Sequence, residues 1–319
     1  MSKLSDKAEN ALNETRMLIL GAQVLIGFGF QAAFQPGFQR LPPPTQELKL
    51  VGLALMLGAL GLLMAPGAFH QIAEGGNDSP RLIQFTGRVA AVALLPFAIG
   101  IGMEVYIVAQ TVLGDAAAVP LGVAGLVFAL VFWYGLEWVW RALDESRGIA
   151  HKEQRVAEPT SLENKIKQVL TEARVVLPGA QALLGFQLTA MLTDAFEKLP
   201  KGSQYVHVAS LCMMAITIVF LMSPAAFHRI VERGEDTERL HRFSSIMLLA
   251  ALVPLGFGIA ADFYVVLDKV LNAPTLALGL SAASLVFFFG LWFGVTLAVR
   301  AVTRRHPARG PLRVSRAVR

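Results

Sequence analysis

The chain has 319 residues, of which 55% are hydrophobic and 16% are charged, and its mean hydropathy is +0.55. These charges are too few to cover the surface of a soluble domain, so the composition indicates a protein embedded in lipid. Cys212 is the only cysteine, which excludes an internal disulfide and a metal cluster held by cysteines. The formal net charge is +5. The distribution of basic residues along the chain indicates which partner this positive charge faces.

The apolar residues gather in blocks long enough to cross the ~30 Å hydrocarbon layer as helices, and they do not alternate as strands would. The blocks predict eight transmembrane helices, near residues 17–36, 50–69, 84–112, 118–140, 175–195, 206–227, 243–268 and 274–299. The first residues are polar, and no small-residue cleavage site follows the first block, so we expect no cleaved signal peptide. The sequence therefore predicts an all-α membrane protein.

Basic residues are divided unequally between the two ends of these helices. The N-terminus, the second–third loop, the central linker, the sixth–seventh loop and the C-terminus hold 23 Lys and Arg residues, against 5 on the opposite side. This split predicts that both termini are cytoplasmic. The positive charge then marks a membrane face that contacts anionic lipid headgroups, and no nucleic acid is expected as a partner. The tail 303–319, with six arginines, is expected to be disordered and to add to this face.

The two halves of the chain match each other at a fixed offset of 158 residues. The matches include Glu14-x-Arg16 with Glu172-x-Arg174, Gly27-Phe28 with Gly185-Phe186, Pro66 and His70 with Pro224 and His228, and, after one inserted residue, Trp133-x-Gly135 with Trp292-x-Gly294. So many aligned Gly, Pro and His positions indicate duplication and fusion. We expect a first four-helix repeat at 1–145, a charged cytoplasmic linker at 146–162, a second repeat at 163–302 and the basic tail.

Each repeat has an even number of spans, so both copies begin on the same side of the membrane. The copies are therefore predicted to be parallel and related by a pseudo-two-fold axis along the membrane normal. Gly21 and Gly27 on the first span, and Gly100 and Gly102 on the third, are expected to let helix backbones approach closely.

The ordered motifs (Glu-x-Arg, Gly-x-Gln and Gly-Phe on the first span, Pro-x-x-x-His ending the second, Arg-Leu opening the third, and Trp-x-Gly before Arg) resemble a bacterial four-span membrane-domain family of unknown function. The resemblance covers each repeat in full. It implies a helical fold and a multi-pass protein of the bacterial cytoplasmic (inner) membrane, and it implies no activity. The chain departs from the family pattern in carrying two copies, and the second copy, with His228-Arg229 where the first has His70-Gln71, is closer to that pattern.

Glu104 and Asp262 are equivalent acidic residues inside the third span of each repeat. A carboxylate at the centre of a span costs about 2.5–3.5 kcal/mol on insertion scales, so it often marks a proton or ion path. Each also lies about ten residues from the outer end of its span, so it could instead reach the outer interface, where the cost falls steeply. Both interpretations stay open.

Other polar residues favour structural roles. His70 with Glu74, and His228 with Glu232, are spaced i,i+4 at helix ends and could form interfacial pairs or a metal half-site. Gln23 and Gln181 are predicted to be buried amides that hydrogen-bond between helices. Glu14, Arg16, Glu172 and Arg174 could pair between repeats or extend to headgroups. Glu137 is expected to pair with Arg141.

Catalytic motifs are absent from the sequence: it has no phosphate-binding glycine loop, His-Glu-x-x-His, Cys-x-x-Cys or Gly-x-Ser-x-Gly. We therefore expect neither an enzyme nor a bound cofactor. The first hypothesis is a structural or regulatory membrane protein, as a homo-oligomer or with a membrane partner. The second is a proton or small-cation pathway through Glu104 and Asp262 at the repeat interface.

Overall fold

The computed structural model describes residues 4–135, 160–233 and 235–305, and this part of the chain is helical without a strand. The long helices are α1 (Leu4–Ala32), α2 (Pro43–Ile72), α3 (Pro80–Leu113), α4 (Asp115–Leu130), α6 (Leu162–Ala190), α8 (Lys201–Ile230), α9 (Glu238–Leu271), α10 (Pro274–Phe289) and α11 (Thr296–Arg305). Short helical turns join them: η1 (Phe38–Arg40), α7 (Asp194–Glu197) and two π-helical turns, η2 (Val131–Gly135) and η3 (Gly290–Val295). The predicted linker and tail fall largely outside the described residues.

Helix starts follow from local side-chain chemistry. The hydroxyls of Ser79 and Thr237 accept hydrogen bonds from the Leu82 and Leu240 amides, 3.0 Å away in both cases, at the beginnings of α3 and α9. Ser161 caps α6 in the same manner, through the Asn164 amide at 3.3 Å. Pro80 occupies the first helical position after its cap, where a missing amide hydrogen costs nothing.

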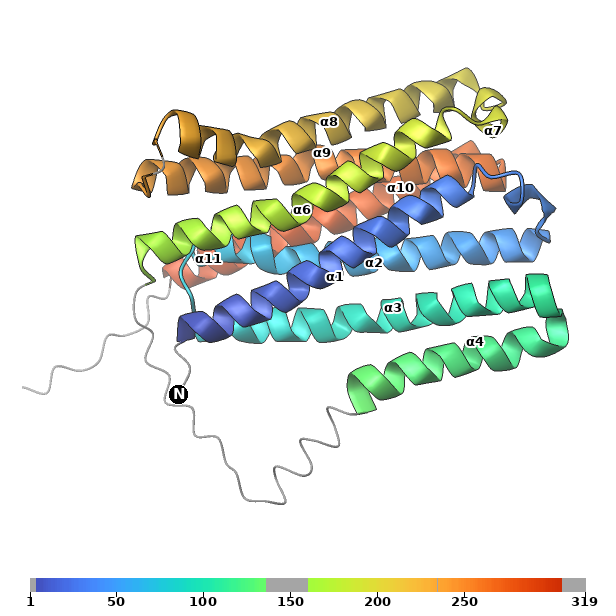
Figure 1. The fold of residues 1–319 in the computed structure, drawn as a ribbon, viewed down its shortest axis with the longest axis horizontal. Coiled ribbons are helices and arrows are strands. Elements are labelled where there is room, and N and C mark those ends of the chain that lie inside the picture. Colours follow the sequence, from blue (N-terminus) through green and yellow to red (C-terminus); the bar gives the residue numbers. More distant parts are fainter. Residues whose placement is uncertain (1–3, 136–159, 234, 306–319) are drawn as a thin grey trace, which may run out of the picture.

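The helices lie nearly side by side and alternate in direction along the chain, except that α11 continues α10 through η3 (Figure 1). α1, α3, α6 and α9 begin at the left end of the bundle in Figure 1, and α2, α4, α8 and α10 begin at the right end. The first helices of the two halves, α1 and α6, cross beside each other at the middle of the molecule. Both halves therefore start from the same end of the bundle.

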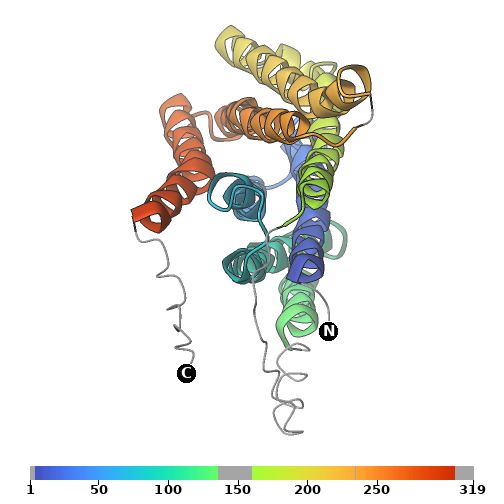
Figure 2. The same cartoon turned by 90° about the vertical axis from the view of Figure 1, so that its left-hand side faces the viewer.

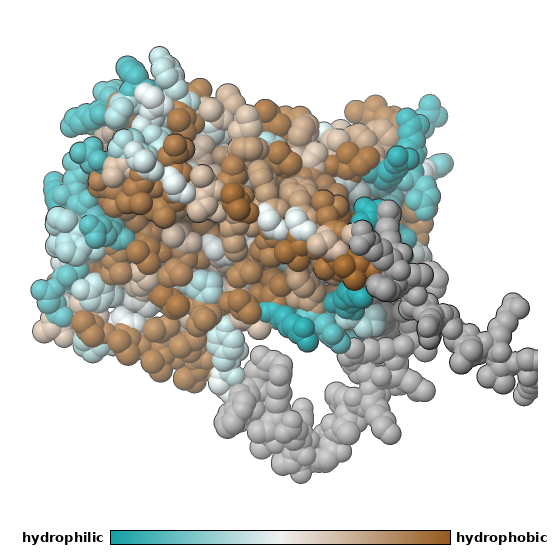
Figure 3. Space-filling view, turned by 180° about the vertical axis from the view of Figure 1, so that it is seen from behind, coloured by the Kyte–Doolittle hydropathy of each residue, from teal (hydrophilic) through white to brown (hydrophobic). Residues whose placement is uncertain are grey.

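Seven helices in the described residues are long and apolar enough to cross a membrane: Lys7–Ala32, Pro43–Ile72, Pro80–Leu113, Asp115–Gly135, Lys201–Ile230, Glu238–Leu271 and Pro274–Val302. Figure 3 shows a band of apolar side chains across one face, with polar side chains at both of its ends, as a bilayer requires. Within the described residues, these findings confirm an all-helical protein with membrane-like helices. The fifth predicted span, 175–195, falls mainly within α6, whose composition is more polar, so this span stays a prediction.

The core gathers around α2, which lies among α1, α3, α9 and α10–α11 when the bundle is viewed from its end (Figure 2). Leu60 and Leu63 of α2 pack in one apolar cluster with Ile26, Leu255 and Trp292. The Trp292 indole is fully buried and donates to the Gly61 carbonyl oxygen at 2.8 Å. This hydrogen bond joins η3 in the second half to α2 in the first.

The expected close approaches at glycines occur at some positions and not at others. A Cβ on Gly102 would lie 3.0 Å from the Gly122 carbonyl oxygen, so the α3 and α4 backbones meet there. A Cβ on Gly27 would lie 2.0 Å from the Phe186 ring, and one on Gly100 would lie 2.4 Å from the Met56 methyl group. At Gly21 nothing lies within 4 Å, so that glycine serves no close contact within the described chain.

Candidate functional site: two buried polar clusters

The first cluster is built on an ion pair that joins the two halves. Arg16 of α1 lies with its Nη2 atom 3.5 Å from Glu172 Oε1 of α6, and both side chains are almost fully buried. The guanidinium also donates to Asn13 Oδ1 at 2.6 Å and to the Gln168 carbonyl oxygen at 3.1 Å. A charge buried in this way is tolerated only where it is paired and hydrogen-bonded.

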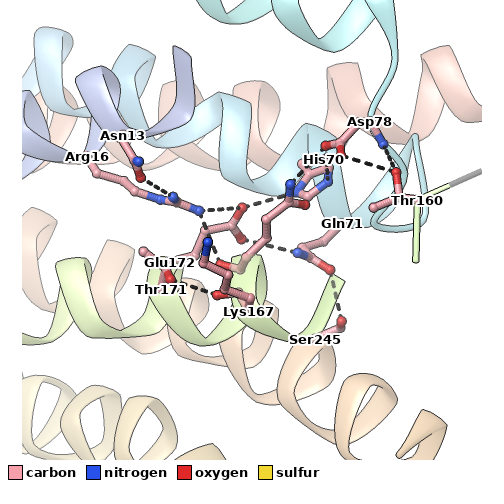
Figure 4. A network of polar contacts seen from close by, with 11 residues as sticks. Asn13, Arg16, His70, Gln71, Asp78, Thr160, Lys167, Thr171, Glu172 and Ser245 are labelled. Carbon is pink, nitrogen blue, oxygen red and sulfur yellow. Dashed lines mark hydrogen bonds and ion pairs between the residues drawn. The ribbon is translucent and has the colours of Figure 1, made fainter. Parts of the chain in front are cut away.

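Glu172 is the centre of this cluster, as Figure 4 shows. His70 Nδ1 lies 3.1 Å from Glu172 Oε1, and the Gln71 amide donates to Oε2 at 3.2 Å. The Ser245 hydroxyl of α9 donates to the side-chain oxygen Oε1 of Gln71 at 2.9 Å, so α1, α2, α6 and α9 all contribute. The cluster around Glu172 thus joins four helices at the end of the bundle where α6 begins.

Asp78 extends the cluster into the loop before α3. Its Oδ1 atom accepts from Gln168 at 3.0 Å and lies 4.0 Å from His70 Nε2. The Asp78 backbone amide donates to the Thr160 hydroxyl at 2.8 Å. Because Thr160 lies two residues before the first residue of α6, this contact ties the start of the second half to the second–third loop of the first half.

The predicted i,i+4 pairs of histidine with glutamate do not form. His70 contacts Glu172 and Asp78, and His228 lies 3.8 Å from Asp236. The reason is that α2 ends at Ile72 and α8 at Ile230, so Glu74 and Glu232 lie beyond the last turn. Glu232 instead lies 3.8 Å from the Arg239 guanidinium.

The second cluster surrounds Asp262 in the second half. His207 Nδ1 of α8 lies 3.1 Å from Asp262 Oδ1, and the Gln187 amide of α6 donates to Oδ2 at 2.5 Å. The same amide nitrogen lies 2.7 Å from the Ser210 hydroxyl, which donates to the Gly258 carbonyl oxygen at 2.7 Å. All of these side chains are buried, and Gln187, His207 and Asp262 line a cavity of about 10 Å³, which is close to the space of one water molecule.

Glu104, the counterpart of Asp262, is in a different setting. Its Oε2 atom lies 2.7 Å from Lys49 Nζ, and its side chain is 55% exposed. Lys49 and His207 are themselves equivalent positions, so each acidic residue pairs with a basic residue of the preceding helix in its own half. The structure therefore brings Glu104 and Asp262 to separate partners and not to each other.

The two predicted buried amides differ. Gln23 is fully buried against Gly179, and neither its amide nitrogen nor its oxygen has a hydrogen-bond partner in the described chain. Gln181, expected to be buried, is exposed. The prediction was wrong there because α1 and α6 do not repeat the contact: Gln23 lies on Gly179, whereas Gly21 has no neighbour.

Sequence reasoning missed Asp78, Gln168, Gln187 and His207. Comparing the halves would have found His207, because Lys49 and His207 are both basic at equivalent positions on the helix before the acidic pair. Arg16 and Glu172 form an ion pair between the two repeats, which was one of the two roles that the sequence left open for them.

Glu137 and Arg141 lie outside the described residues. Within the described chain, no three His, Cys, Asp or Glu side chains come together as metal ligands.

A family model described as a family of unknown function matches the chain in two segments, residues 2–137 and 157–296. The two matches together cover most of the chain and are consistent with a tandem duplication. The resemblance inferred from the motifs is therefore confirmed. No curated protein and no solved structure matches the chain.

Proposed function

The chain belongs, in both halves, to the family of unknown function DUF6328, and we propose that it is a structural or regulatory membrane protein without catalysis. The observation that carries this proposal is the Arg16–Glu172 cluster. Its charged groups come from both halves and form ion pairs and hydrogen bonds with other residues of the protein. These contacts hold the two halves together. Arg16 and Glu172 also line a cavity of about 40 Å³, whose other wall residues are mainly apolar, such as Ile19.

An eighth span through α6 is part of the proposal. The helix has 29 residues, about 43 Å at 1.5 Å per residue, which exceeds the thickness of the hydrocarbon layer. Part of its low hydropathy has a structural reason: Gln168, Glu172 and Gln187 are buried against other helices and paired there. Polar residues that face a bundle interior do not prevent a helix from spanning.

Pseudo-two-fold symmetry is supported by contacts that recur at equivalent positions. Thr45 bonds to Gln110 at 2.8 Å as Ser203 bonds to Asp268 at 2.7 Å. The stacked rings of Phe69 and Phe85 recur as Phe227 and Phe243, and the ion pairs of Glu104 and Asp262 recur as described above. The equivalent Phe28 and Phe186 rings touch each other, with centroids 4.5 Å apart, as residues beside a two-fold axis must.

The proposed orientation places the termini, and the Arg16–Glu172 cluster near them, on the cytoplasmic side of a bacterial inner membrane. The 23-to-5 division of Lys and Arg supports it, because positively charged loops are retained in the cytoplasm.

A proton or small-cation pathway is the second candidate, and the buried Asp262–His207 pair beside its small cavity favours it. The test is flux into proteoliposomes under a proton or cation gradient, with Asp262→Asn compared with Glu104→Gln. The structural proposal expects wild-type flux equal to that of protein-free liposomes. Wild-type flux that Asp262→Asn abolishes and Glu104→Gln leaves intact would establish the pathway and end the structural proposal.

A further inference from the structure

A cavity of about 570 Å³ lies between α6 and α8 in the second half. One part of its wall is basic, with Arg174 from α6, His228 and Arg229 from the end of α8, and Arg233 from the turn that follows. The rest is apolar and includes Leu177 and Leu221. The cavity is thus amphipathic, with its cationic side at the end of the bundle where α6 begins and α8 ends (Figure 1).

The arginines of this cavity have no acidic partner among the residues that the structure describes. Arg174, Arg229 and Arg233 are exposed, and the recorded ion pairs of this region use His228, Asp236, Glu232 and Arg239 instead. Arg233 also adopts a left-handed backbone conformation, with φ of 52°, where its counterpart in the first half is Gly75 with φ of 59°. The left-handed turn after the helix is thus kept in both halves, and in the second half an arginine occupies it although a Cβ is disfavoured there.

The first half contains a much smaller cavity at the equivalent place. It measures about 40 Å³, and it is lined by Arg16, Ile19 and Leu63, the counterparts of Arg174, Leu177 and Leu221. Glu172 also lines it and neutralises Arg16, and α9 residues such as Leu252 complete its wall. Gln71 and Gly75 stand where the second half has Arg229 and Arg233.

We propose that the cavity between α6 and α8 binds an anionic phospholipid, with its phosphate at Arg174, Arg229 and Arg233 and an acyl chain along Leu177 and Leu221. Guanidinium groups form charge-assisted, often bidentate bonds to phosphate, and basic pockets between helices at the cytoplasmic side suit such headgroups. The apolar part of the wall favours a lipid over a free anion. This inference rests on the proposed membrane orientation, and it assigns the lipid site to one half only.

The test is native mass spectrometry of the full-length protein in detergent, titrated with dioleoyl phosphatidylglycerol or dioleoyl phosphatidylcholine. We expect wild-type protein to bind the first phosphatidylglycerol at least about tenfold more tightly than phosphatidylcholine. The double variant Arg174→Gln/Arg229→Gln should lose about tenfold or more of that affinity. The control variant Arg88→Gln/Arg242→Gln removes two exposed arginines from the N-terminal parts of α3 and α9, outside the cavity. It should change the affinity for phosphatidylglycerol by less than about twofold.

Three outcomes overturn the inference: equal affinity of wild type for the two lipids, equal losses in the two double variants, or displacement of the lipid by inorganic phosphate alone, which would indicate a free-anion site. Circular dichroism checks that the variants fold, and Arg174→Lys/Arg229→Lys, which keeps the charge, should retain most of the binding. Failure here leaves the flux result untouched, so it is distinguishable from failure of the proposed structural role.

Discussion

At the scale of single residues, Glu172 is the position where one substitution should cost most. Glu172→Gln leaves Arg16 buried without its counter-charge, which typically costs about 3–5 kcal/mol. Its counterpart Glu14 is exposed, so Glu14→Gln should cost less than about 0.5 kcal/mol. The measurement is the free energy of unfolding in mixed detergent micelles. If Arg16→Met is added to Glu172→Gln, part of the loss should return; a double variant less stable than either single one would contradict the pairing.

Asp262 and Glu104 form a second matched pair, because they are equivalent in sequence and unlike in burial. Asp262→Asn removes a buried charge that His207 and Gln187 both contact, and we expect a loss of about 2–4 kcal/mol in the free energy of unfolding. Glu104→Gln breaks an exposed pair with Lys49 and should cost about 1 kcal/mol or less. Similar losses in the two variants would mean that burial does not separate them as the structure indicates.

At the scale of helices, the α1–α6 contact depends on Gly27. Gly27→Ala places a methyl group where the Phe186 ring lies, so the ring must move and the helices loosen, at a cost of about 1–3 kcal/mol. Gly21→Ala on the same helix meets nothing within 4 Å, and its higher helix propensity should leave stability unchanged or raised by up to about 1 kcal/mol. The measurement is the midpoint of thermal unfolding of the two variants in detergent. Equal shifts of the midpoint would mean that the close approach at Gly27 does not stabilise this interface.

The π-helical turns η2 and η3 occupy equivalent positions and carry Trp133 and Trp292, yet only the second is fully buried. Trp292→Phe removes the hydrogen bond to the Gly61 carbonyl oxygen and should lower the free energy of unfolding by about 1–3 kcal/mol. Trp133→Phe, at a half-buried site, should change it by less than about 1 kcal/mol. A larger loss for Trp133→Phe would contradict the packing of η3 on α2.

At the scale of the whole molecule, the sequence predicts well the features that recur in both halves and the long apolar helices that a lipid bilayer requires. Block length and composition predicted eight spans, and seven of them are helices long and apolar enough to cross a membrane. The offset between Glu14-x-Arg16 and Glu172-x-Arg174 predicted the duplication. Tertiary partners were harder, because the two halves are not packed identically. Gln23 and Gln181 have the same local sequence and opposite exposure, and His70 turns to Glu172 of the other half, which no spacing along α2 encodes.

The number of spans depends on whether α6 crosses the membrane, because its composition alone does not identify it as a transmembrane helix. If it crosses the membrane, residues 163 and 192, near its two ends, must face opposite sides. In a chain carrying Cys212→Ser, a membrane-impermeant maleimide added to intact cells should label Leu192→Cys and Gln39→Cys. It should label Glu163→Cys and Glu235→Cys only after permeabilisation. All five of these positions are described, and the four labelled ones are exposed.

The pattern of labelling separates the possible errors. Labelling of residues 163 and 192 from one side alone would make α6 an interfacial helix and leave seven spans, and the two halves could not then be parallel four-helix units. Labelling of 163 and 235 from outside, with 39 and 192 protected, would instead keep eight spans and reverse the orientation. That result would place the Arg16–Glu172 cluster and the basic cavity at the outer face, where the positive-inside rule gives no reason for so many arginines.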